Sequence, residues 1–286
     1  MSKLTQRLLT FFIGIPLVLI VVYIPACNHV VLNTVIVIVS LISSLETYNL
    51  MKAKSPMQPK IAVICLSLTI PVSALICTLT HMDFTLTTFT FIAAFMVLMI
   101  LEIFTPQKDG MSDEDIFSEA NKKLSGSLFV LLYGSFMLTF LSRMTILENS
   151  TAYIMVFLMM VFICDSAAWL FGMCFGKNNR GHVKASPNKS IAGFVGGVAG
   201  SIASGILGWY LWPHVFTGSI LKMIILGLII SVTSILGDLS ESVFKRSAGC
   251  KDSGNVIPGR GGILDSIDSI LMSAPAFYFV VMLMFE

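Results

Sequence analysis

Long apolar runs alternate with short polar segments along almost the whole chain of 286 residues. A helix needs about 20 mainly apolar residues to cross the hydrocarbon core of a bilayer. Runs of that length occur at 8–26, 29–50, 60–80, 84–104, 124–143, 151–171, 191–213, 220–242 and 264–285. The pattern therefore predicts an all-α integral membrane protein, a polytopic helical bundle of about nine transmembrane helices that forms a single domain over 1–286.

The composition agrees with this pattern. Hydrophobic residues make up 56% of the chain and charged residues 12%, and the mean hydropathy is +0.88. Soluble domains carry about 25% charged residues. The six cysteines lie mostly inside apolar runs and lack the spacing of a metal site, so we expect them to act as small hydrophobic residues. The apolar start resembles a signal peptide, but the runs that follow favour an uncleaved first span.

Lysine and arginine are distributed unequally between the two sides that these runs define. If the N-terminus lies inside, all but two of the 18 cations fall in inner segments, and the exceptions are Arg143 and Lys222. Cytoplasmic loops carry an excess of Lys and Arg. We therefore expect a multi-pass protein of the cell (inner or plasma) membrane with a cytoplasmic N-terminus. Its N-terminal helices (1–123) precede the helices of 124–286, whose loops 172–190 and 243–263 face the cytoplasm.

Carboxylates gather at the inner ends of the last two runs. Asp238, Glu241 and Lys245 fall at i, i+3 and i+7 on one helix face, and Asp265 and Asp268 share another. Such oxygen ligands suit Mg²⁺ with substrate phosphates completing its octahedron. The alternative is structural, with ion pairs to Lys245 and carboxylates at a helix N-terminus. The basic loop between the two faces favours the metal site. A further acid, Glu46, ends the second run.

Two basic, glycine-containing loops flank these acids. In PGRGG (258–262) the glycines allow close backbone approach and direct N–H groups toward an anion just before a helix N-terminus. Positive charge for phosphates comes from Lys245, Arg246, Lys251 and Arg260. The second loop, within 175–197, is either an anchor for anionic lipid headgroups or a clamp on a phosphate.

The spacing of these residues resembles a known family. The chain is similar to the C-terminal signature of phosphatidate cytidylyltransferases (CDP-diacylglycerol synthases) at Ser242, Lys245, Arg246, Lys251, Asp252, Pro258, Gly261, Gly262, Asp265 and Asp268. DSAAWLFGMCFGK and SPNKS, within 165–190, and ETYNL, at 46–50, also resemble that family. Three positions depart from its pattern: Arg260 stands in place of His, Ser266 in place of Arg, and Ala192 in place of Glu.

The resemblance implies Mg²⁺-dependent transfer of CMP from CTP to phosphatidate, giving CDP-diacylglycerol and pyrophosphate in phospholipid biosynthesis. It implies catalytic roles for Asp238, Lys245, Arg246, Lys251, Asp252, Asp265 and Asp268. It implies substrate binding by Lys189, Ser186, Ser190, Arg260, Gly261, Gly262 and Asp165. The implied ligands of Mg²⁺, with a second cation as an option, are Asp238, Asp265, Asp268 and Glu241. The expected partners are CTP, phosphatidate and membrane lipids, without nucleic acid, and the small-residue face of 191–213 permits a homodimer.

Two other functions remain open. A CTP-dependent lipid kinase would transfer the γ-phosphoryl group and release CDP instead of pyrophosphate. A membrane transporter is disfavoured, because its carboxylates would be expected near the bilayer midplane and its helices in paired broken positions.

Overall fold

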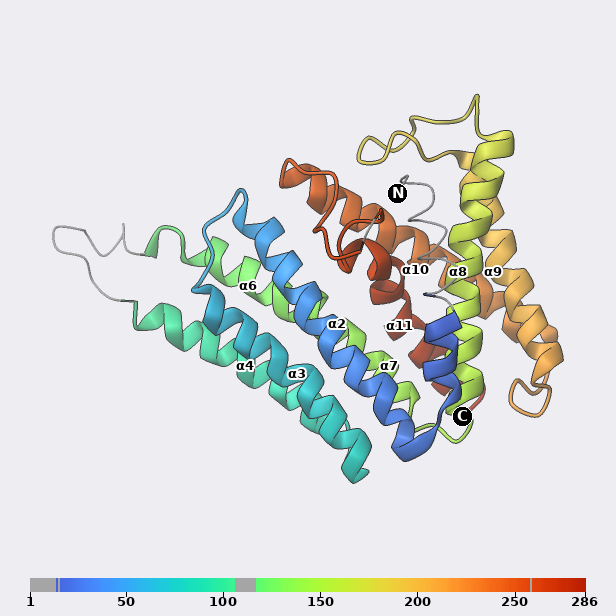
Figure 1. The fold of residues 1–286 in the computed structure, drawn as a ribbon, viewed down its shortest axis with the longest axis horizontal. Coiled ribbons are helices and arrows are strands. Elements are labelled where there is room, and N and C mark those ends of the chain that lie inside the picture. The colour runs from blue at the N-terminus through green and yellow to red at the C-terminus, as the bar shows by residue number, and fades with distance from the viewer. Residues whose placement is uncertain (1–13, 15, 106–116, 258) are drawn as a thin grey trace.

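The computed structural model describes residue 14 and residues 16–105, 117–257 and 259–286 of the chain. Regular structure in this part is helical, without a β-strand, and its elements are shown in Figure 1. They are α2 (Ala26–Lys52), α3 (Lys60–Thr80), α4 (Thr85–Ile103), α6 (Ala120–Gly134), the short 3-10 helix η1 (Phe136–Leu138), α7 (Thr139–Met144), α8 (Ser150–Phe175), α9 (Ile191–Leu211), α10 (Ile220–Ser247) and α11 (Leu264–Met284).

The prediction of an all-α membrane protein is confirmed. Among the described residues, eight helical segments are long and apolar enough to cross a bilayer, and α6, η1 and α7 together form one of them, Ala120–Met144. Each of the eight lies within a few residues of a predicted run. The runs locate the helices because a helix that crosses the bilayer needs an apolar stretch of a defined length. The first predicted span, 8–26, lies partly outside the described residues, and its described residues 16–23 are helical.

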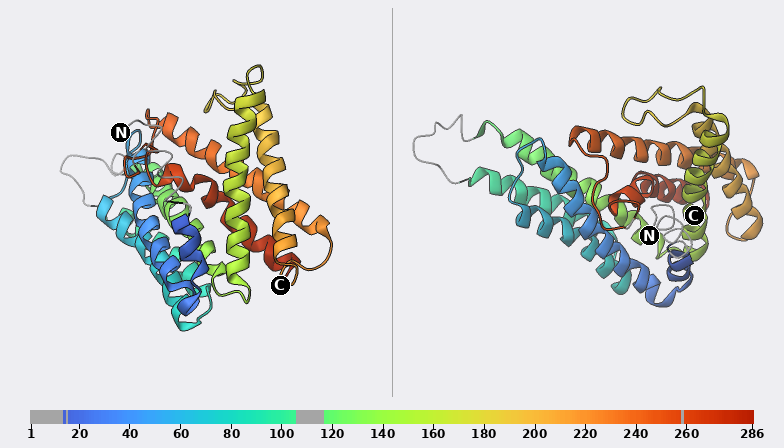
Figure 2. Two further views of the ribbon diagram at one scale, coloured as in Figure 1. Left: turned by 45° about the vertical axis from the view of Figure 1, so that its right-hand side comes forward. Right: turned by 45° about the horizontal axis from the view of Figure 1, so that its top comes forward.

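The helices form two groups, which the two views of Figure 2 separate. In one group α2, α3, α4 and α6 pack together, and in the other α9 packs between α8 and α10, which also contacts α11. The predicted division after residue 123 falls within α6, whose packing partners include α2, α3 and α4. Helices α7 and α11 contact each other where the groups meet.

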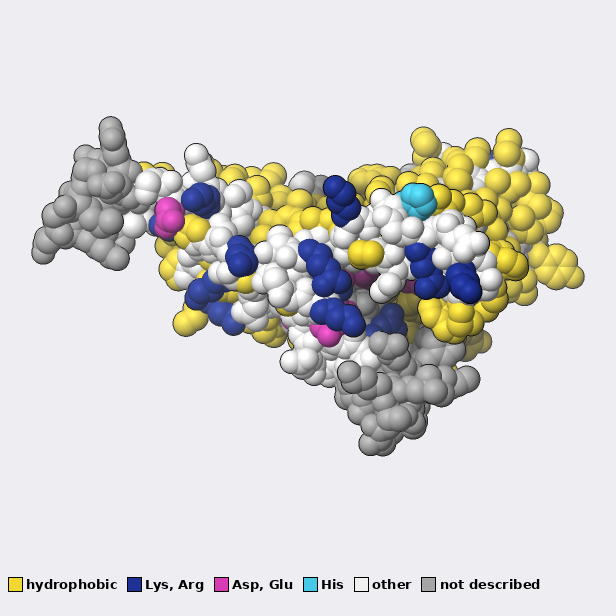
Figure 3. All heavy atoms as spheres, turned by 90° about the horizontal axis from the view of Figure 1, so that it is seen from above, with side chains coloured by type: hydrophobic (Ala, Val, Ile, Leu, Met, Phe, Trp, Pro, Cys, Tyr) yellow, Lys and Arg dark blue, Asp and Glu magenta, His cyan; other side chains and the backbone are white. Residues whose placement is uncertain are grey.

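The loops after α2, α8 and α10 lie at one end of the bundle, which we call the basic end, and the loops after α3, α7 and α9 lie at the other (Figure 1). Lys and Arg side chains gather on the basic end, as Figure 3 shows. The two exceptional cations bind groups at the opposite end. Arg143 donates to the hydroxyl of Thr88 at 3.1 Å, and Lys222 donates to the carbonyl oxygen of Met284. The cytoplasmic orientation of the basic end stays a prediction.

Glycines set the spacing of the second group of helices. A Cβ at Gly200 of α9 would lie 2.8 Å from the Cβ of Ala167 on α8, and one at Gly193 would lie 2.8 Å from the Ala168 carbonyl oxygen. The small-residue face of α9 therefore packs within the chain, and it does not supply the surface for the predicted homodimer.

A glycine also allows α10 and α11 to pack closely, and this contact predicts an effect on stability. A Cβ at Gly237 would lie 2.4 Å from the backbone carbonyl oxygen of Asp268, which cannot move without shifting α11. We expect Gly237→Ala to lower the free energy of unfolding by about 1–3 kcal/mol, the usual cost of overpacking. Thermal unfolding of the purified protein in detergent measures this change.

Gly126→Ala is the matched control, because the nearest atom to its added Cβ is the flexible thioether of Met57. Alanine is favoured over glycine in a helix by about 1 kcal/mol. We expect this variant to unfold at or above the wild-type temperature. Equal midpoints for the two variants would contradict a close contact between α10 and α11.

Candidate functional site

A pocket of about 480 Å³ opens at the basic end between α8, α9, α10 and the loop 176–190. Its charged lining consists of Asp165, Asp238, Lys189 and Arg180, and part of its wall is apolar, with Trp169, Met173, Phe194 and Ile235. A pocket with both kinds of wall at the edge of the apolar spans suits a ligand that has a charged head and an apolar tail. Lys189, Ser186, Ser190 and Asp165, all predicted to bind substrate, line it.

Opposite charges meet inside this pocket. The ammonium group of Lys189 makes an ion pair with Asp238 of α10. Burial lowers the pKa of Lys189 from its usual value, and the carboxylates of Asp268 and Asp165 oppose that shift. Asp165 Oδ1 lies 3.4 Å from Ser234 Oγ and 3.3 Å from Ser269 Oγ, so both hydroxyls donate to it. Helices α8, α10 and α11 therefore meet around the floor of the pocket.

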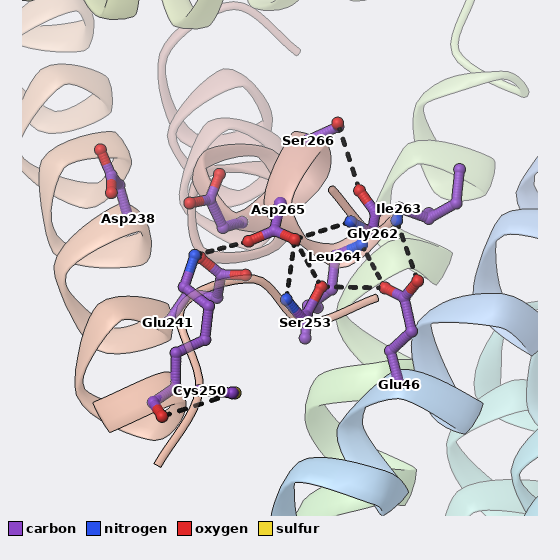
Figure 4. Close-up of polar contacts among 12 residues, drawn as sticks. Glu46, Asp238, Glu241, Cys250, Ser253, Gly262, Ile263, Leu264, Asp265 and Ser266 are labelled. Carbon is purple, nitrogen blue, oxygen red and sulfur yellow. Dashed lines mark hydrogen bonds and ion pairs between the residues drawn. The ribbon is translucent and has the colours of Figure 1, made fainter. Parts of the chain in front are cut away.

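A second charged cluster lies at the start of α11 (Figure 4). Lys245 Nζ lies 2.6 Å from Asp265 Oδ1 and also pairs with Glu241 one turn earlier on α10. Asp265 Oδ2 accepts from the backbone N–H of Ser253 at 2.8 Å, from its hydroxyl at 2.9 Å and from the N–H of Gly262 at 2.7 Å. The structural alternative predicted that carboxylates pair with Lys245. Glu241 and Asp265 do so, whereas Asp238 pairs with Lys189.

Glu46 of α2 reaches the same loop from the other group of helices. Its Oε1 accepts from the N–H of Ile263 at 3.1 Å, and its Oε2 accepts from the N–H of Leu264 at 2.8 Å. Ser253 Oγ also lies 3.1 Å from Oε2. The sequence marked Glu46 as an acid at the end of an apolar run but assigned it no role, because its partners lie more than 200 residues away.

The backbone N–H groups of Gly261 and Gly262, two residues predicted to bind substrate, have partners within the chain. The Gly261 N–H donates to the carbonyl oxygen of Ile257 at 3.0 Å, and the Gly262 N–H donates to Asp265. These donors are therefore satisfied by the chain itself, and substrate binding by Gly261 and Gly262 stays a prediction. Pro258, the first residue of the glycine-rich stretch, lies outside the described residues.

The remaining predicted residues occupy different positions around the two clusters. Ser190 is 3% exposed, and its hydroxyl caps α9 by accepting the Gly193 N–H at 3.1 Å, so it has a structural role. Arg246 links the two loops by donating from Nε to the Ala185 carbonyl oxygen at 3.4 Å. Lys251, Asp252 and Arg260 are exposed at the basic end.

The three residues that depart from the family signature lie at defined positions in the structure. Ser266 lies in the first turn of α11 and donates to the Gly262 carbonyl oxygen at 3.5 Å. Ala192 lies in the first turn of α9, partly buried. Arg260 is a permanent cation, so it can bind a phosphate but cannot act as a proton acceptor at neutral pH.

The carboxylates of the two clusters are candidate ligands for a metal ion. Within the described ranges, no three Asp, Glu, His or Cys side chains are grouped as a ready set of ligands. Mg²⁺, however, commonly takes one or two carboxylates and completes its shell with substrate phosphates and water. Glu241 Oε1 is buried without a hydrogen-bond partner, and the buried Asp268 adds a further carboxylate beside it in α11. Carboxylates therefore outnumber the two nearby cations, Lys189 and Lys245. This net negative charge fits a bound metal ion.

Comparison with known proteins shows the family of the chain. Residues 5–284 match the model of the cytidylyltransferase family. Proteins named phosphatidate cytidylyltransferase are similar to 43% of the chain: the protein of Synechocystis sp. is 45% identical over 41% of its own length, that of Staphylococcus haemolyticus 41% over 46%, and that of Haemophilus influenzae 39% over 44%. The chain thus matches less than half the length of these curated relatives. The family model spans nearly all of the sequence, and the chain belongs to the cytidylyltransferase family.

Proposed function

We propose that the protein is a phosphatidate cytidylyltransferase, which transfers CMP from CTP to phosphatidate and releases pyrophosphate, with its active site at the cytoplasmic face of the cell membrane. The observation that carries the proposal is the 480 Å³ pocket at the basic end, in a chain of this family. Its charged floor suits two phosphate-bearing substrates, and its apolar wall suits the glycerolipid. The acyl chains would stay in the bilayer.

In the proposed reaction an oxygen of the phosphatidate phosphate attacks the α-phosphorus of CTP. A new P–O bond forms while the bond to the bridging oxygen of the β-phosphate breaks, and that oxygen leaves with the pyrophosphate. The attacking oxygen is already ionised at neutral pH, so no residue needs to remove a proton. The main task of the site is to neutralise and orient the phosphates.

The side chains around the pocket suit this task. Lys189, which lies within the pocket, would donate to the phosphates, and Arg180 and Arg260 would add positive charge at its edge. Asp238 and Asp265 would hold Mg²⁺, with Glu241 and Asp268 as further ligands. When bound, Mg²⁺ would offset the charge that the phosphates bring together. Lys245 lies against Asp265 and orients this carboxylate.

The central test follows the label of the nucleotide. Full-length protein in detergent, supplied with phosphatidate, Mg²⁺ and α-labelled CTP, should move the label into lipid, and a chelator should stop the transfer. We expect Asp265→Asn to lower the rate by about 100-fold or more, as for the loss of one preorganised charged group. Asp83→Asn, at the opposite end of the bundle, is the matched control and should keep wild-type activity.

γ-labelled CTP separates the proposed reaction from its main alternative. A lipid kinase would place the γ-label in lipid and leave the α-label in free CDP. That result would refute the proposed chemistry, whereas α-label transfer that survives in Asp265→Asn would refute the proposed role of Asp265.

A second prediction concerns Lys189. We expect Lys189→Met to lower kcat/KM for CTP or phosphatidate by about 10- to 100-fold, since hydrogen bonds to charged groups contribute about 1.5–3 kcal/mol. Lys184→Met is the control, because Lys184 is an exposed lysine of the same loop. Steady-state kinetics with each substrate varied in turn measures the change. Equal losses in the two variants would mean that the general charge of the loop, and not a contact in the pocket, matters.

A further inference from the structure

The start of α11 contains backbone donors that the helix itself cannot satisfy. The first N–H groups of any α-helix lack an intrahelical acceptor. The N-cap residue Ile263 provides no side-chain hydrogen bond to the helix, yet Leu264 is fully buried. Glu46 from α2 accepts the N–H groups of both residues. A carboxylate in this position gains charge-assisted hydrogen bonds and a favourable interaction with the helix N-terminus.

The loop is shaped closely around this carboxylate. A Cβ at Gly254 would lie 2.4 Å from Glu46 Oε1, and a Cβ at Gly262 would lie 2.5 Å from Oε2. Only glycine fits at either position while Glu46 stays in place. Glu46 itself is 5% exposed. The glycine-rich segment therefore does enclose an anion, but that anion belongs to the chain.

Ser253 connects Glu46 to Asp265. Its hydroxyl lies 3.1 Å from Glu46 Oε2 and 2.9 Å from Asp265 Oδ2, and its single hydrogen can be donated to only one of them at a time. The backbone N–H of Ser253 is donated to Asp265 as well. A displacement of Glu46 would therefore change the position of the loop that holds Asp265 (Figure 4).

We infer that Glu46 is a positioning residue: by filling the anion site of the glycine-rich loop it fixes the start of α11 and the orientation of Asp265. This role rests on the proposed cytidylyl transfer, in which Asp265 takes part. Glu46 does not contact substrate in this scheme. It acts from the first group of helices on a site built by the second, so the two groups must be assembled for the reaction to proceed.

Hydrogen exchange tests the anchor without any need for activity. In Glu46→Gln the side chain keeps one acceptor oxygen, but its NH₂ group faces an N–H donor. We expect amides of the segment 253–264 to exchange at least tenfold faster, with unchanged exchange in α8 and α9. Glu102→Gln is the matched control: Glu102 is 6% exposed and pairs with Lys123 in the first group of helices, so it also removes a buried carboxylate. This control should leave the exchange of 253–264 unchanged.

Kinetics tests the consequence for the reaction. We expect Glu46→Gln to lower kcat by about 100-fold with little change in either KM, because small misplacements of a reacting geometry cost about that much. Ser253→Ala, which leaves Glu46 intact, should give a smaller loss in the same direction. In Glu46→Ala, acetate replaces the missing CH₂–COO⁻ group, so it should restore part of both the amide protection and kcat, whereas chloride at equal ionic strength should not.

The results separate the anchor from the proposed function. Wild-type exchange and kcat in Glu46→Gln, or an equal loss of kcat in Glu102→Gln, would overturn the positioning role. If the wild-type protein transfers no cytidylyl group, the proposed function fails by itself, and the exchange measurement still decides whether Glu46 holds the loop.

Discussion

The contact between Lys245 and Asp265 is the interaction on which the candidate site depends. It joins α10 to α11, and the Lys245 and Asp265 side chains are only 14% and 6% exposed. Charges buried to this extent are stable only when each has a partner, and removing one member of such a pair typically costs about 3–5 kcal/mol. Asp265 therefore also takes donors from Ser253 and Gly262. These hydrogen bonds hold Ser253 and Gly262 against the ion pair.

The close packing of helices places the second part of the site. Gly227 allows α10 to approach α9 so closely that an added Cβ would lie 2.7 Å from the Ile202 Cα, and Gly237 allows the similar approach of α11. In an apolar environment such contacts, more than hydrophobic burial, hold helices together. They also bring Asp165 of α8 within reach of Ser234 and Ser269. The pocket is thus a consequence of backbone packing, and its Asp165 lies where three helices converge.

The sequence predicted local features well and long-range contacts poorly. Helix spans followed from apolar length, and the pairing of Glu241 with Lys245 followed from their i, i+4 spacing. Asp238, on the same face, pairs instead with Lys189, which lies in another loop. The spacing of glycines indicated an anion beside the α11 N-terminus, but Glu46 was identified as that anion only by the structure. Periodicity specifies a face of one helix, and it contains no information about which distant residue meets that face.

The occupied glycine-rich loop has a consequence for how phosphates would be held. Backbone N–H groups are fixed donors, but those of residues 261–264 are already used by Ile257, Asp265 and Glu46. Positive charge for the proposed substrates must then come from side chains, chiefly Lys189 in the pocket and the exposed Arg260. Arginine binds phosphate as a charge and, at neutral pH, exchanges no proton with it. That property suits a displacement whose nucleophile is already ionised, so the replacement of histidine by Arg260 removes nothing that the proposed chemistry needs.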